Sequence, residues 1–240
     1  RDGGCGEAAE ESLVQKGLAA MTDGVVIAGR LGVPFQEIPL SPKRRGSSGR
    51  HRNRTVTIID WDDTLLPSHE IFTSGNEKIV NDPSTIDATF RKYLDEIEDR
   101  ALKLLQRSLT HGLVIVVTAS EAGWVERSGS ACLPRVLAFF RKHSIRVISA
   151  RSRYERHCGP NDWKVRAFHD EIKQMFYTKN GVHVVVIGDG FSEWLAARSL
   201  KDTYSGMVVK TIKLQEAPNA QQLAYELSLL ETSIESIFDH

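Results

Sequence analysis

The chain has 240 residues, of which 41% are hydrophobic and 26% are charged, and its formal net charge is zero. These values are typical of globular proteins and allow one α/β domain with a well-buried core plus an appendage. Residues 55–240 hold 22 Lys/Arg against 25 Asp/Glu, so bulk charge gives no strong nucleic-acid signal for this part. No apolar run approaches the length of a membrane span, so we expect no membrane partner.

The cysteines indicate a reducing environment. Cys5, Cys132 and Cys158 are odd in number and widely spaced. This pattern argues against a disulfide framework and against a Cys-rich zinc site. We therefore expect a cytoplasmic protein, with the nucleus as the alternative because residues 43–54 hold six Lys/Arg.

The first 54 residues differ from the rest of the chain. They are rich in Gly, Ser and charged residues and offer little that could form a core. We predict a partly disordered N-terminal extension over 1–54, with a short helix over 12–21 and a basic linker over 43–54. A localisation signal or a patch for an anionic partner is the alternative interpretation of that linker. A catalytic domain is predicted over 55–240.

From residue 55 onward, apolar strands alternate with amphipathic helices. We predict strands over 55–60, 113–118, 145–150, 182–188 and 207–214. Helices are predicted from Pro83 onward, over 134–143, over 162–176 with Asp162 as its cap, over 192–200, and at the C-terminal end. The first helix carries an apolar stripe of Phe90, Leu94, Ile97, Ala101 and Leu105, and the last one carries Leu223, Leu227, Leu230, Ile234 and Ile237.

This alternation predicts the fold class. At least three strands are apolar throughout, which is typical of strands buried on both faces of a parallel sheet. The predicted fold is therefore a three-layer, Rossmann-like α/β sandwich with a central five-stranded parallel sheet and helices on both faces. In such sheets, ligands bind at the carboxyl ends of the strands, at the topological switch point.

Polar residues stand where these strands end and where the following helices begin. The first strand ends in Asp60 and Asp62, the second in Thr118 and Ser120, and the fourth in Asp189 and Glu193, while Lys164 lies near the start of a helix. Carboxylates, hydroxyls and an ammonium at one sheet edge are the groups that a magnesium-assisted phosphoryl transfer needs.

Together these residues resemble the four motifs of the haloacid dehalogenase superfamily, whose members are mostly phosphatases. The matching residues are Asp60, Asp62 and Thr64 for the first motif, Thr118 for the second, Lys164 for the third, and Gly188, Asp189 and Glu193 for the fourth. Two-component receiver domains use similar groups, but there the Lys comes last. In this chain Lys164 precedes Asp189, so motif order favours the phosphatase-like family.

The resemblance implies a role for each matched residue. Asp60 is the expected nucleophile and Asp62 the expected general acid and base. Thr118, Ser120 and Lys164, together with Asp62, are expected to bind the phosphate. The expected Mg²⁺ ligands are Asp60, the main-chain carbonyl of Asp62, Asp189, and Glu193 either directly or through water.

Several nearby residues have structural interpretations instead. Asp63 is predicted to be a turn or capping residue, and Thr64 and Ser120 could satisfy loop amides. Trp61 and Trp163 are predicted to pack near the site. Three arginines in the loop before Lys164 are expected to be solvated, with contact to an anionic substrate as the alternative: Arg151, Arg153 and Arg156.

The intervals between motifs leave no room for a cap domain. About 20 residues separate Thr64 from Ser84, enough for a flap only. The resemblance therefore implies an open site that acts on a phosphorylated protein or bulky metabolite. The alternatives are a small-molecule phosphatase and a catalytically silent binding or scaffold protein of the same fold. The sequence makes no prediction of the oligomeric state.

Overall fold

Five parallel strands form one central sheet. The computed structural model describes residues 54–238, so the predicted helix over 12–21 and all of the basic stretch except Arg54 lie outside the described residues. The strands are β1 (Thr55–Ile59), β2 (Leu113–Thr118), β3 (Arg146–Ser149), β4 (His183–Gly188) and β5 (Val208–Lys213), in the order β3-β2-β1-β4-β5. Each neighbouring pair is parallel. The predicted fold class is confirmed.

The burial of the strands follows their place in the sheet. All five residues of the central strand β1 are buried, and so are the last five residues of β2 and β4. The edge strands β3 and β5 are mostly half-exposed. Continuous Val and Ile runs are therefore explained by helices that cover both faces of the inner strands.

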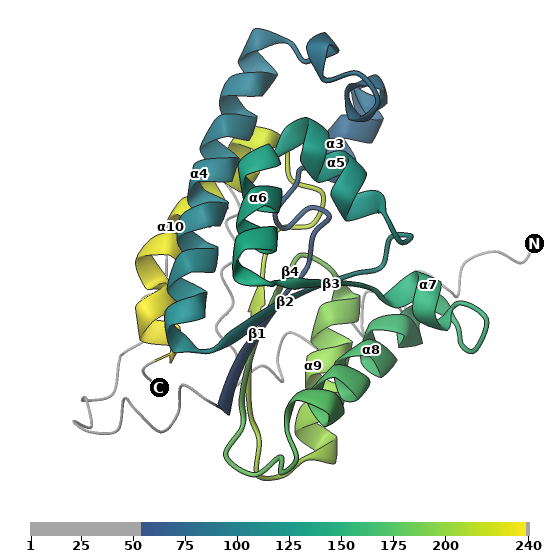
Figure 1. The fold of residues 1–240 in the computed structure, drawn as a ribbon, viewed down its shortest axis with the longest axis vertical. Helices are drawn as coiled ribbons and strands as arrows, with labels where there is room; N and C mark the ends of the chain where they lie inside the picture. The colour runs from purple at the N-terminus through teal and green to yellow at the C-terminus, as the bar shows by residue number, and fades with distance from the viewer. Residues whose placement is uncertain (1–53, 239–240) are drawn as a thin grey trace, which may run out of the picture.

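Helices form a layer on each face of the sheet (Figure 1). One layer consists of α4 (Ala88–His111), α5 (Trp124–Cys132), α6 (Pro134–His143) and α10 (Ala220–Phe238), and the other of α7 (Ala150–Tyr154), α8 (Pro160–Met175) and α9 (Phe191–Thr203). Alternation along β1 serves both layers, because Ile59 packs in the first core and Ile58 in the second. The predicted apolar stripes of α4 and α10 are buried.

Two helices start away from their predicted positions. The long helix α4 begins at Ala88 and not near Pro83, because the Asp87 carboxylate accepts from the amides of Thr89 and Phe90. Pro83 instead opens a short 3₁₀ turn. Asp162 does not cap α8, since that helix already begins at Pro160 and Asp162 lies within its first turn.

A segment of short helices and turns follows β1. Helix α5 follows β2, and the sequence pattern did not predict it. Residues 67–87, here called the flap segment, contain α3 (Ser68–Thr73) and two 3₁₀ turns, Glu77–Val80 and Pro83–Thr85. Trp124 opens α5 and joins the same core as α4. Among residues 54–238, no helix is both long and apolar enough to cross a membrane.

Candidate functional site

The site lies where the chain changes direction across the sheet. From β1 the chain goes to β2 and β3 on one side, then returns to β4 on the other side of β1. Asp60 directly follows β1 and Asp189 directly follows β4, two strands that are neighbours in the sheet. Such a switch point leaves a crevice at the carboxyl ends of the strands.

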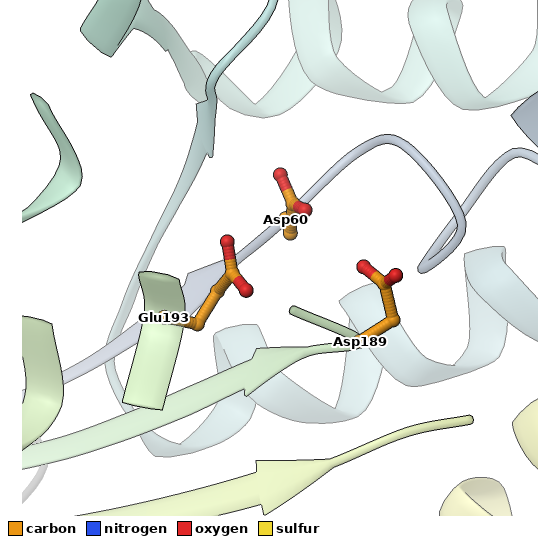
Figure 2. A group of neighbouring side chains, drawn as sticks. All are labelled: Asp60, Asp189 and Glu193. Atoms are coloured by element: carbon orange, nitrogen blue, oxygen red, sulfur yellow. The ribbon is translucent and has the colours of Figure 1, made fainter. Parts of the chain in front are cut away.

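Three carboxylates converge in this crevice. One oxygen each of Asp60, Asp189 and Glu193 lies within 4.8 Å of the others. Figure 2 shows their carboxylates turned toward a common space, although they come from the loop after β1, from the loop after β4 and from α9. Sequence reasoning assigned all three to one cation, and the structure brings them together.

Lys164 lies within the same cluster and is only 2% exposed. Its Nζ is 2.8 Å from Asp60 Oδ1 and also contacts Glu193 Oε1, which Ser192 Oγ approaches to 2.9 Å. Asp60 Oδ1 thus has the ammonium as its partner, whereas Glu193 Oε2 is buried and has no hydrogen-bond partner. Unsatisfied buried acceptors are rare in native proteins, so Glu193 Oε2 calls for a further ligand.

The charges in the cluster do not balance. Burial raises the pKa of Asp60 well above its usual range; the charge of Lys164 opposes this rise, and the neighbouring carboxylates add to it. Burial, with the carboxylates of Glu193 and Asp63, raises the pKa of Asp189 to about 7. Burial thus opposes the ionisation of Asp60 and Asp189, and a bound cation would favour their ionised forms.

The pKa values of Lys164 and Glu193 both shift in the direction that favours the charged form. Burial by itself lowers the pKa of Lys164, but the carboxylates of Asp60 and Glu193 raise it by more, so the ammonium stays charged. Burial raises the pKa of Glu193, yet the contact with Lys164 lowers it further than burial raises it. Lys164 and Glu193 are thus an ionised pair, whereas burial favours the neutral forms of Asp60 and Asp189.

Asp62 lies apart from the acidic cluster in a hydrogen-bonded position of its own. Its Oδ1 accepts from Ser68 Oγ at 2.6 Å and from Trp124 Nε1 at 2.7 Å. Its Oδ2 accepts from Thr118 Oγ1 at 3.0 Å and from Ser120 Oγ at 2.7 Å. Four donors therefore fix the carboxylate. The structure brings Thr118 and Ser120 to Asp62, whereas Lys164, the fourth residue predicted to bind phosphate, contacts Asp60 and Glu193.

The loop that carries Asp189 is held from two sides. Asp189 N donates to Thr64 Oγ1 at 3.1 Å, and the Thr64 hydroxyl lies 3.3 Å from Asp189 Oδ1. Lys213 Nζ, at the end of β5, donates to the main-chain carbonyl of Asp189. Thr64 thus satisfies a loop amide, as the structural interpretation of the sequence had it, and also orients a carboxylate.

Gly188 allows Glu193 to reach the cluster. A Cβ on Gly188 would lie 2.4 Å from Glu193 Cγ and 3.0 Å from its Cδ. Any larger residue would displace the Glu193 side chain from its position beside Lys164. The glycine of the Gly-Asp pair is therefore required by close packing.

The neighbouring residues mostly serve structure. Asp63 has φ 53° and accepts from His69 N at 2.8 Å, so it is a turn and capping residue, as predicted. Trp61 is fully buried and donates to Ser128 Oγ at 3.0 Å. Arg153 pairs with Glu171 at 2.7 Å.

Sequence reasoning missed three residues of the site. Ser68 and Trp124 hold Asp62, and Lys213 holds the loop of Asp189. Ser68 follows the first motif by a few residues and could have been suspected from that position. No local pattern marked Trp124 or Lys213, because each meets its partner only through the packing of distant segments.

Comparison with family models, curated proteins and solved structures finds no match to this chain.

Proposed function

We propose that the chain is a magnesium-dependent phosphatase of the haloacid dehalogenase superfamily that acts through an aspartyl-phosphate on Asp60. The observation that carries this proposal is the convergence of Asp60, Asp189 and Glu193 within 4.8 Å, with Lys164 among them. A buried carboxylate beside an ammonium and two further carboxylates suits a nucleophile that works next to a divalent cation.

The donor set fits Mg²⁺. All three side chains offer hard oxygen atoms, and Glu193 Oε2 is buried without a hydrogen-bond partner. Asp60, Asp189 and Glu193 would hold the ion, with the main-chain carbonyl of Asp62 as a fourth protein ligand. When bound, the ion would neutralise the crowded carboxylates and the charge of the phosphoryl group.

The chain's own residues supply the remaining steps. An oxygen of Asp60 attacks phosphorus, the bond from phosphorus to the leaving oxygen breaks, and that oxygen takes a proton from Asp62. A water molecule then gives a proton to Asp62 and attacks phosphorus, which releases phosphate and restores the Asp60 carboxylate. Lys164 offers N–H donors for the phosphoryl oxygens, and the Thr118 and Ser120 hydroxyls, which donate to Asp62 in this structure, would turn to these oxygens when phosphate binds.

The surroundings support a bulky substrate. In the described part of the chain, the flap segment holds only α3 and two short turns, and Thr118 is joined to α8 by α5, α6, β3 and α7. Neither interval contains an inserted domain that could close over a small molecule. We therefore propose a phosphorylated protein or another bulky phosphate ester as the substrate class.

A reducing compartment such as the cytoplasm remains our proposal for the location. The thiols of Cys132 and Cys158 are both free. Burial raises the pKa of Cys132 to about 11, so this thiol is protonated and unreactive.

Hydrolysis of a generic aryl phosphate tests the proposal. We expect turnover that requires Mg²⁺ and falls by at least about 10³-fold in Asp60→Asn, because the amide is not a nucleophile. Asp162→Asn is the matched control, since Asp162 is an exposed carboxylate in the first turn of α8. Wild-type protein without magnesium-dependent turnover, or equal turnover in Asp60→Asn, would favour the silent binding protein.

A further inference from the structure

An aromatic pair lies directly beside Asp62. Trp124 donates its indole N–H to Asp62 Oδ1 at 2.7 Å, and its ring stacks on Phe72 with centroids 5.5 Å apart and an interplanar angle of 28°. Trp124 is buried, whereas Phe72 is 53% exposed. The pair joins α3 of the flap segment to α5, two helices that lie next to each other in Figure 1.

The proposed role of Asp62 as the general acid indicates that this pair would face the leaving group of the substrate. The group that protonates the leaving oxygen must come within hydrogen-bond reach of it. The leaving group of the substrate would therefore lie against Asp62, beside the Trp124 ring that binds Asp62 Oδ1 and the Phe72 ring that stacks on it. An aliphatic leaving group would leave the exposed face of Phe72 in water, but an aromatic ring would cover it and stack.

The exposure of Phe72 is not explained by support of the fold alone. A residue that only anchored α3 would bury most of its ring, as Ile71 on the same helix does. Phe191 is also exposed and lies at this edge, but its ring stacks on Trp194 of its own helix. Tyr177 is fully exposed and lies before β4, at the opposite ends of the strands. Phe72 differs from Tyr177 because its inner face contacts a residue that binds Asp62.

We propose that Phe72 and Trp124 form a leaving-group subsite that selects aryl phosphate esters, with phosphotyrosine in an accessible peptide segment as the substrate. This inference rests on the proposed phosphatase function. It adds a preference for aryl esters to the proposed phosphatase activity, and it assigns part of that preference to Phe72 on α3 of the flap segment.

Two peptides of one sequence, carrying either phosphotyrosine or phosphoserine, test the subsite in Mg²⁺. The intrinsic difference between phenol and alcohol leaving groups is the same for every variant, so it cancels when variant and wild type are compared. We expect Phe72→Ala to lower the phosphotyrosine-to-phosphoserine ratio of kcat/KM by about three- to tenfold, the worth of an aromatic pair. Phe72→Leu, which keeps an apolar side chain on α3, should lose most of the same selectivity.

Controls separate the subsite from simple damage to the flap segment. Tyr177→Ala should leave both peptides unaffected. Phenyl phosphate should show the same dependence on Phe72 as the phosphotyrosine peptide, because the ring alone makes the contact. If Phe72→Ala lowers both peptides equally, or Phe72→Leu keeps full selectivity, the subsite is wrong.

A further substrate keeps failure of the subsite distinct from failure of the proposed function. Acetyl phosphate has no aromatic group and should be hydrolysed in a reaction that requires Asp60. If it is, and the peptides show no Phe72-dependent selectivity, the phosphatase stands and the aryl subsite is refuted. If no substrate is hydrolysed in an Asp60-dependent reaction, the proposed function fails and the subsite fails with it.

Discussion

Asp60→Asn is expected to stabilise the metal-free protein while it abolishes activity. Asp60 contributes one of three carboxylates within 4.8 Å, and each repulsion at that distance costs about 3 kcal/mol at an effective dielectric constant of 20. The attraction between Lys164 Nζ and Asp60 Oδ1 at 2.8 Å stabilises the protein by about 6 kcal/mol at the same dielectric constant. These terms nearly cancel, so the desolvation of a buried carboxylate, several kcal/mol, decides the sign.

The sign also depends on pH. The folded-state pKa of Asp60 is raised, so the folded protein binds more protons than the unfolded chain between the two pKa values. Wild-type stability is therefore lost as pH rises through that window, and the asparagine variant lacks this loss. We expect the variant to match wild type near pH 4 and to exceed it by about 1–3 kcal/mol at pH 8, because Lys164 keeps its contact with Glu193.

Thermal unfolding in EDTA measures this difference, at about 2–4 °C per kcal/mol for a domain of this size. Excess Mg²⁺ should reverse the order, since it stabilises wild type by binding the folded state and the variant lacks one ligand. The Asp162→Asn control should behave as wild type throughout. An Asp60→Asn protein that is less stable than wild type in EDTA at pH 8 would show that the attraction of Lys164 dominates, and would refute the reasoning.

Three further predictions concern the neighbours of this carboxylate. The rise in unfolding temperature caused by Mg²⁺ should be larger at pH 8 than at pH 6, because Asp189, with a pKa of about 7, must lose its proton to bind the ion. Gly188→Ala should destabilise the protein by about 1–3 kcal/mol and weaken Mg²⁺ binding in calorimetry, because the added methyl group displaces Glu193. Trp124→Phe keeps an aromatic ring but removes the hydrogen bond to Asp62, and it should lower kcat by about tenfold with little change in Mg²⁺ affinity.

Each of these has a clear contrary result. A magnesium effect that does not change with pH would mean that Asp189 does not bind the ion. Gly188→Ala with unchanged stability and Mg²⁺ affinity would mean that Glu193 has room to move. Trp124→Phe with wild-type kcat would mean that Asp62 does not depend on the indole for its position.

The order of elements could be predicted from the sequence because it depends on local periodicity. Runs of Val and Ile, as in β2 and β4, and the β-branched residues of β1 are typical of strands buried on both faces, which is how these three strands lie. The convergence of Asp60 with Asp189 could be predicted as well, since both follow parallel strands and such ends share one sheet edge. Topology alone brings together residues more than a hundred positions apart.

Tertiary structure decided what no local pattern carries. The start of α4 depended on which of several nearby polar residues caps it, and Asp87 does so. Helix α5 has a weak sequence pattern, and its burial against the α4 layer makes it a helix. The partners of Asp62 likewise come from α3 and α5, which meet only in the folded chain. The side chains that hydrogen-bond Asp62 do so because the folded chain brings them close to it, and their spacing in the sequence does not indicate this closeness.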